Sequence, residues 1–249
     1  AVTSNVRSVF RTSSRSKEST TLGPSPFRQP LTNGTKAPSP VGDNGDVNPS
    51  LRPDLPLVHI TSRADWRQWL KREHARSKGV WVVTLKKDAL GPKDKFVSAV
   101  DVNEECLCFG WIDSRPARID AQRSALLCTP RKPGSGWSKV NKDRLERLLE
   151  ADLVAPAGLD VIERAKNDGS WSRLDGVDRL EVPKDLSTAF KAHPSSRENF
   201  DAFPPSTRRA ILEWINNAKT PTTRMKRVTE TAELAAQNVR ANQWTRRKD

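Results

Sequence analysis

Large apolar side chains are distributed unevenly along the 249-residue chain. Residues 1–54 contain few of them and are rich in Ser, Thr, Pro, Gly and Asn, whereas residues 55–249 contain nearly all of the Trp, Leu and Ile. A segment of the first kind cannot bury enough apolar surface to offset the entropy lost on ordering. We therefore predict a disordered, basic, Ser/Pro-rich tail over residues 1–54 and one folded domain over residues 55–249.

Helical and strand periodicities both occur in the first part of this domain. Ser62 is suited to cap a helix, after which Trp66, Trp69 and Leu70 fall on one helical face. The next segment is β-branched and aromatic over strand length. The predicted elements are a helix after Ser62 that ends before Gly79, a strand over 79–86, a helix over 97–108, and paired strands over 111–119 and 124–129.

From Trp137 onward the periodicity is helical, with proline at several positions where a first helical turn tolerates it. Ser206 is suited to cap one of these helices, and Thr220 followed by Pro221 opens the last. The predicted apolar stripes are Leu145, Leu148 and Leu149; Leu159, Ile162 and Ala165; Leu186, Ala189 and Phe190; Ile211, Leu212, Ile215 and Ala218; and Met225, Val228, Ala232, Ala235 and Val239. The sequence therefore predicts an α+β fold, in which a small β-sheet with two helices is followed by a helical C-terminal half.

The formal net charge of +13 changes the range of expected partners. A strongly cationic surface attracts nucleic acid, anionic lipid or acidic protein faces. The same charge can serve only to keep the protein soluble, because net charge governs association rather than fold. The charge therefore favours an anionic partner, but it does not indicate whether that partner is nucleic acid, lipid or protein.

Two further features concern the compartment. No stretch approaches the roughly 20 apolar residues that a membrane-spanning helix needs, so we predict no transmembrane segment. Three cysteines make no disulfide framework, and their odd number indicates reduced thiols and an intracellular, cytoplasmic location. Residues 1–17 contain Arg, Lys and Ser but no acidic residue, which fits a mitochondrial transit peptide as the alternative location and fits a generic basic tail equally well.

Several uncommon combinations of residues follow one another in a recognisable order. They are WRQWL, GVWVVTLKK, ECLCFGWID, TPRKPGSGWSKVN, APAGLDVIERAKNDGSW, VPKDL and AKTPTTRMKR. In this order they resemble the YdeI/OmpD-associated, or bacteriocin-protection, family over roughly residues 60–239, with FGWID and residues 129–141 the most specific parts. Cys106 departs from the pattern, which shows a small residue there, so Cys106 and Cys108 are not expected to act as a functional pair. The tail also lies outside the resemblance.

The resemblance implies a role in tolerance of bacteriocins, cationic antimicrobial peptides and related stress, partly through association with an outer-membrane porin. It implies no enzymatic mechanism, and a fold alone does not define one. A cationic protein should not attract cationic peptides by charge. We therefore expect protection to act through an unidentified protein or envelope partner.

A group of polar and aromatic residues is predicted near one end of the sheet. Asp113 and Arg131 leave neighbouring strands, and Trp137, Ser138 and Asn141 begin the next helix. Arg131 could bind a carboxylate or phosphate beside the free N–H groups of that helix. The alternative is purely structural: Ser138 and Asn141 cap the helix, Asp113 pairs with Arg131, and Trp137 fills the edge of the core.

The last predicted helix offers a second anion site, because Lys219 and Arg224 lie beside its first turn. The same residues fit a well-capped helix with a solvated basic face equally well. The candidates for nucleic-acid binding are Arg227, Trp244, Arg246 and Arg247, since an exposed Trp among cations can stack on a base.

Signatures of catalysis are nearly absent. The histidines, His59, His74 and His193, have no Cys or carboxylate partner at ligand spacing, and Cys106-x-Cys108 lacks the second pair of a zinc site. No Gly-rich phosphate loop and no GxSxG motif occurs. We therefore expect no metal and no cofactor, and the sequence favours a protein that is not an enzyme.

Three hypotheses follow from these features. The first is a non-enzymatic binding protein of the bacteriocin- or antimicrobial-peptide-protection type with an anion-recognising basic surface. The second is a nucleic-acid-binding or ribonucleoprotein-associated subunit. The third is an uncharacterised enzyme or small-anion binder that uses Asp113, Arg131 and Asn141, whose side chains would then have to lie close together.

Overall fold

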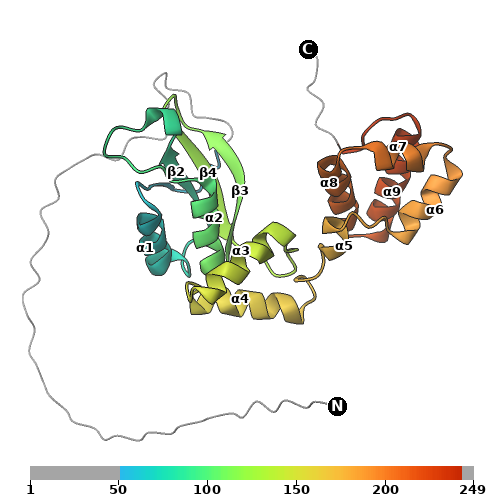
Figure 1. Ribbon diagram of the computed structural model, residues 1–249. Helices are drawn as coiled ribbons and strands as arrows, with labels where there is room; N and C mark the ends of the chain where they lie inside the picture. Colours follow the sequence, from blue (N-terminus) through green and yellow to red (C-terminus); the bar gives the residue numbers. More distant parts are fainter. Residues whose placement is uncertain (1–50, 243–249) are drawn as a thin grey trace, which may run out of the picture. The chain divides into compact units, whose positions relative to one another are not determined.

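The computed structural model describes residues 51–242 and has the predicted α+β architecture (Figure 1). Residues 1–50 of the predicted tail lie outside this range. The strands are β1 (Leu57–His59), β2 (Val80–Leu85), β3 (Trp111–Arg118) and β4 (Arg123–Pro130). The helices are α1 (Arg63–Glu73), the short 3-10 helix η1 (Lys87–Ala89), α2 (Ala99–Cys108), α3 (Lys139–Glu150), α4 (Pro156–Asn167), α5 (Asp175–Asp178), α6 (Lys184–Ala192), α7 (Ser196–Ala202), α8 (Pro205–Asn216) and α9 (Pro221–Ala236).

The four strands form one mixed sheet in the order β1-β2-β4-β3. The short strand β1 is parallel to β2, and the other pairs are antiparallel. Three residues are too few to show a strand period, which is why the sequence did not predict β1. The pairing of β3 with β4 shifts register between Asp113 and Pro116, as at a β-bulge.

Alternate residues of each strand enter different apolar layers, as the two-residue period of a strand requires. Val80 and Val82 of β2 pack with the buried faces of α1 and α2. Trp81 and Val83 point to the other face, where they pack with Leu127. Both faces of the central strand are therefore buried, which explains its uninterrupted apolar sequence.

Helices α3 and α4 share the core of the sheet. Leu145 and Leu148 of α3 and Ile162 and Ala165 of α4 belong to the same buried cluster as the residues of α1 and α2. The predicted stripe of α3 is confirmed for these two leucines, but Leu149 is 44% exposed. The sheet-associated core therefore extends through α4.

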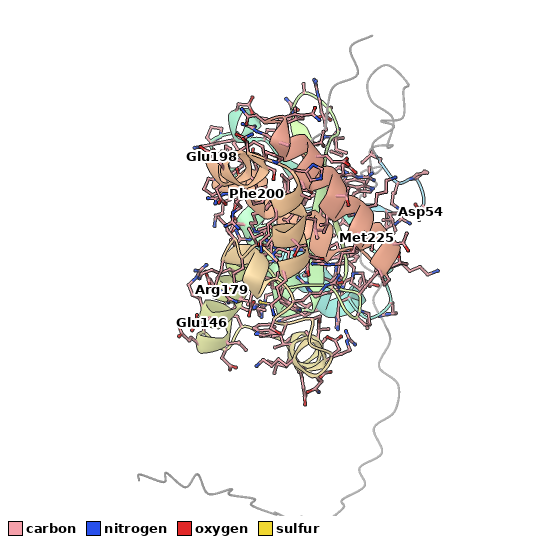
Figure 2. The ribbon with its side chains drawn as sticks, turned by 90° about the vertical axis from the view of Figure 1, so that its right-hand side faces the viewer. Asp54, Glu146, Arg179, Glu198, Phe200 and Met225 are labelled. Carbon is pink, nitrogen blue, oxygen red and sulfur yellow. The ribbon has the colours of Figure 1, made fainter. Side chains whose placement is uncertain are left out.

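A second buried cluster is built from α5 to α9. Phe200 of α7 is fully buried, whereas Met225 of α9 is 69% exposed (Figure 2). Only the inner part of the predicted α9 stripe is buried, namely Val228, Ala232 and Ala235.

The N-terminal caps of α1 and α9 are residues that the local sequence predicted. The Ser62 hydroxyl accepts a hydrogen bond from the backbone N–H of Asp65 at the start of α1. The Thr220 hydroxyl accepts one from Thr223 at the start of α9. Both caps were predicted. The prediction that Ser206 caps α8 is wrong, because this helix begins at Pro205, whose missing N–H costs nothing in a first turn.

Candidate functional site

The predicted polar group near the sheet comes together around a residue that the sequence did not single out. Asn103 of α2 is 3% exposed, and its Nδ2 donates to Asp113 Oδ1 (2.6 Å) and to Asn141 Oδ1 (3.4 Å). Its own Oδ1 accepts from Arg144 Nη1 (2.6 Å). The four side chains therefore form one network, in which the polar atoms bond mainly to each other.

Arg131 lies beside this network but is deeply buried, at 6% exposure. Its guanidinium stacks on the ring of Trp137, 3.7 Å from the ring centroid, and Nη1 donates to the carbonyl of Gly136 (3.0 Å). Burial lowers the pKa of Arg131 to about 10, although the charge of Asp113 acts in the opposite direction. Arg131 is still protonated at neutral pH, and Trp137 compensates for part of its lost hydration.

The N-terminus of α3 is occupied by a carboxylate from the chain itself. Ser138 is the N-cap, and its hydroxyl accepts from the backbone N–H of Asn141 (3.4 Å). The backbone N–H of Lys139 donates to Asp178 Oδ2 (2.7 Å), while Asp178 Oδ1 accepts from Arg209 (2.8 Å). The anion that this helix end favours is thus Asp178. The structural alternative is right about the cap by Ser138 and the burial of Trp137. It is wrong about Asn141 and Asp113, whose side chains bond to Asn103 rather than capping the helix or pairing with Arg131.

The second predicted site is partly neutralised in the same way. Arg224 donates from Nε to Asp185 Oδ2 (2.6 Å) and from Nη2 to Asp185 Oδ1 (3.1 Å), a bidentate ion pair. Partial burial opposes ionisation of Asp185, but the hydrogen bonds from Arg224 and from the Leu186 backbone outweigh it, so the pKa of Asp185 is lowered. Lys219 is exposed.

Arg224 nevertheless lines a cavity of about 260 Å³ between α5, α6, α8 and α9. We call this space the basic cavity. Its apolar walls are formed mainly by Val177, Leu212 and Ile215, which belong to the buried cluster of α5 to α9. The lining residues are Arg173, Gly176, Val177, Glu181, Val182, Pro183, Lys184, Leu212, Ile215, Asn216 and Arg224.

Two of the cations in the basic cavity have no carboxylate partner among residues 51–242. Arg173 donates from Nη1 to the carbonyl of Gly134 (2.7 Å) and from Nη2 to Asn217 Oδ1 (3.2 Å), both neutral acceptors. Lys184, at the start of α6, is exposed and its ammonium has no ion pair. The nearby Glu181 is already paired with Arg179 (2.6 Å). The cavity therefore carries excess positive charge over an apolar floor.

The sequence analysis did not single out Arg173, which lies in no recognisable pattern, or Lys184, which lies in the VPKDL segment but was not assigned a role. They join Arg224 only when the segment before α6 folds against α8 and α9. Lys184 did carry one signal, since it follows Pro183 at a predicted helix start.

The nucleic-acid candidates are not brought together in the described part of the chain. Arg227 donates to the backbone carbonyl of Trp214 and its guanidinium lies 4.9 Å from the centre of that ring. Trp244, Arg246 and Arg247 lie outside the described residues. The Arg227 side chain therefore contacts α8 from α9 and is occupied within the protein.

Residues 51–242 contain neither a metal-binding cluster nor a membrane-spanning helix. No group of three or more His, Cys, Asp or Glu side chains there is arranged to hold a metal ion. Within the same residues no helix is both long enough and apolar enough to cross a membrane. All three cysteines are buried with free thiols.

Together these features define an α+β protein with a basic cavity in its last helices. Two family models match the chain, one in each part. Residues 179–238 match the family described as bacteriocin-protection, YdeI or OmpD-associated, and residues 58–161 match a domain of unknown function (DUF8412). No curated protein and no solved structure matches the chain.

The first of these matches confirms the resemblance for the segment that contains α6 to α9, including VPKDL and AKTPTTRMKR. It supports a bacteriocin-protection role at the level of the family. FGWID and residues 129–141 instead fall in the range of the second model. Most residues that line the basic cavity lie within the 179–238 match.

Proposed function

We propose that the chain is a non-enzymatic binding protein of the bacteriocin- and antimicrobial-peptide-protection type, and that it recognises an anionic group in the basic cavity. The observation that carries this proposal is the pair of cations, Arg173 and Lys184, that line the cavity without a carboxylate partner among the described residues. Such cations form charge-assisted hydrogen bonds with a carboxylate or phosphate.

The shape and lining of the basic cavity restrict the ligand. At about 260 Å³ it is smaller than the roughly 300–1,000 Å³ of typical small-molecule sites. Leu212 and Ile215 form part of its floor and are almost fully buried. These properties favour a small carboxylate with an apolar body, or the anionic end group of a larger partner.

This ligand class also fits the charge problem posed by protection against cationic peptides. The protein is itself cationic, with a formal net charge of +13, so it would repel such peptides. An anionic protein or envelope component that binds in the basic cavity would connect this cationic protein to protection against cationic peptides. We therefore place the partner, rather than the peptide, in the cavity.

The proposal is tested by titrating the ¹⁵N-labelled chain with benzoate and with its neutral analogue benzamide. We expect benzoate to shift the amide resonances of Gly176, Val177 and Ile215, which line the cavity. Benzamide should shift them far less, because it lacks the charge. Equal responses to the two compounds would contradict anion recognition.

A charge reversal on α6 identifies the site. Lys184→Glu should weaken benzoate binding about tenfold or more, since a charge-assisted hydrogen bond contributes about 1.5–3 kcal/mol. Lys191→Glu is the matched control, because Lys191 is exposed on the same helix and does not line the cavity. Equal losses in the two variants would indicate a general effect of charge.

The protective role needs a separate measurement. A bacterium that expresses the chain should survive a cationic antimicrobial peptide better than the same strain without it. Lys184→Glu should abolish this gain and Lys191→Glu should keep it. An unchanged sensitivity on expression of the wild-type chain would count against the protective role, and not against anion binding itself.

A further inference from the structure

A second hollow lies on the sheet and is apolar rather than basic. We call this space, of about 310 Å³, the sheet groove. It lies in the part of the chain that matches the domain of unknown function. The lining residues are Val82, Thr84, Leu85, Lys86, Phe96, Val97, Ala99, Val102, Pro116, Ser124, Ala125 and Leu126.

The groove exists because the helix over the sheet is shorter than the strands beneath it. Strand β4 has eight residues and spans about 26 Å, whereas the ten residues of α2 span about 15 Å. Val102 of α2 is buried on the sheet, but Ala99, the first residue of the helix, is exposed.

The register of the strands makes the floor of the groove continuous. Val82 of β2 pairs with Leu126 of β4, which in turn pairs with Pro116 of β3. These three side chains form one apolar row across three strands. Next to them Thr84 pairs with Ser124, so the floor becomes polar toward the end of β2.

Two of the residues that line the groove, Phe96 and Lys86, differ in character. Phe96 is 49% exposed, a large apolar surface left in water at the rim. Lys86 Nζ donates to the backbone carbonyls of Asp120 and Ala121 (both 2.8 Å), which are neutral acceptors. Its charge is not paired with a carboxylate within residues 51–242. The groove thus combines an apolar row with one uncompensated cation.

The segment that connects Lys86 to Phe96 adds positive charge. Residues 86–95 contain four lysines and two aspartates, a net charge of +2. This connection starts at Lys86 and ends next to Phe96, and both of these residues line the groove. An occupant with an apolar chain and a negative head group would match both features.

We propose that the sheet groove binds a single-chain anionic amphiphile of the fatty-acid class. The alkyl chain lies along the row of Val82, Leu126 and Pro116 and covers the exposed ring of Phe96. The carboxylate lies at Lys86. This site is independent of the basic cavity, which is built from different helices and favours short ligands.

The test is a titration of the ¹⁵N-labelled full chain with octanoate, decanoate and dodecanoate, each below its critical micelle concentration. Every buried methylene should strengthen binding about fourfold, hence about fifteenfold for each step of two carbons until the groove is filled. The amide resonances of Val97 and Leu126 should shift. Affinity that does not depend on chain length overturns the proposal.

The head group is tested with dodecyltrimethylammonium, which has the same chain and the opposite charge. Dodecanoate should bind at least tenfold more tightly, and Lys86→Gln should reduce this preference. Lys87→Gln is the control, since Lys87 is exposed and does not line the groove. Equal affinities of the two amphiphiles for the wild-type chain overturn the proposal.

Two neighbouring substitutions on α2 locate the site. Ala99→Trp places an indole in the groove and should abolish dodecanoate binding. Val100→Trp changes the next residue, which is 44% exposed and does not line the groove, and should leave binding within twofold. Thermal melting checks that both variants fold. Retained binding in Ala99→Trp overturns the proposal, whereas benzoate binding at Lys184 should be unaffected in either variant.

Discussion

At the scale of single residues, the polar side chains near the sheet are fixed by their neighbours rather than free to bind a ligand. Although Asp113 lies within β3 rather than after a strand end, the sequence predicted that Asp113, Arg131 and Asn141 lie near one end of the sheet. It did not show that Asn103 joins two of them, since an Asn on a helix carries no signal of its distant partners. Nor could it show that Arg131 is 6% exposed and stacked on Trp137.

Asn103 therefore provides the prediction at this scale. Asn103→Ala removes hydrogen bonds to Asp113, Asn141 and Arg144 and leaves these groups partly buried without their partner. Each stranded group costs roughly 1–3 kcal/mol, so the free energy of unfolding should fall by about 3 kcal/mol. Urea denaturation measures it.

The matched control is Asn167→Ala, because Asn167 is exposed at the end of α4. This change should stay within about 0.5 kcal/mol of the wild-type value. A loss below about 1 kcal/mol for Asn103→Ala would mean that solvent replaces the network.

At the scale of elements, boundaries with a local chemical signal were predictable. Ser62 and Thr220 cap their helices as expected, and the apolar run of β2 marked a buried strand. What the sequence could not give is how elements meet. The parallel pairing of β1 with β2 and the approach of α4 to α2 depend on residues far apart in the chain.

Gly158 is the residue that permits this approach. A Cβ at this position would lie 2.4 Å from the carbonyl oxygen of Cys108 at the end of α2. The same oxygen accepts a hydrogen bond from the backbone N–H of Ala155 (2.9 Å), so α4 cannot move away without losing it. Close packing of the two backbones therefore requires glycine.

Gly158→Ala sets helix propensity against packing. Propensity alone predicts a gain of up to about 1 kcal/mol, because Gly158 lies within α4. Overpacking against backbone atoms costs about 1–3 kcal/mol, and here the helix must also shift. We expect the cost of overpacking to exceed the gain in helix propensity. The free energy of unfolding, measured by urea denaturation, should therefore fall by about 2 kcal/mol. A stabilised variant would show that α4 adjusts freely.

At the scale of the whole molecule, the positive charge does not form the single basic surface that the sequence suggested. The net charge of +13 suggested a basic surface, yet three of the four predicted site cations within residues 51–242, Arg131, Arg224 and Arg227, have internal partners. Arg224 pairs with Asp185, and Arg227 contacts Trp214. Sequence could indicate the helix start that contributes Arg224, but not that Arg173 and Lys184 reach the same cavity, because that requires the tertiary fold.

The apolar residues fall into separate clusters, one around the sheet with α1 to α4 and another within α5 to α9. The sequence predicted one domain over residues 55–249, and the two clusters raise the question of whether they unfold together. Contacts do link them: Lys139 of α3 bonds to Asp178 of α5, and Lys142 forms an ion pair with Asp175. Such exposed or part-buried links are weaker than the cores that they join.

Phe200→Ala separates the two possibilities. Phe200 is fully buried between Phe190 and Phe203, so its truncation should cost about 3–5 kcal/mol. If the clusters are separate cooperative units, hydrogen exchange should lose protection in α6 to α9 and keep it in β2 and β4. We expect this outcome, because the polar links between α3 and α5 are too weak to transmit a loss of this size. An equal loss of protection in the sheet would instead show that residues 55–249 unfold as a single cooperative domain. A change in stability would then affect binding in the basic cavity and in the sheet groove together.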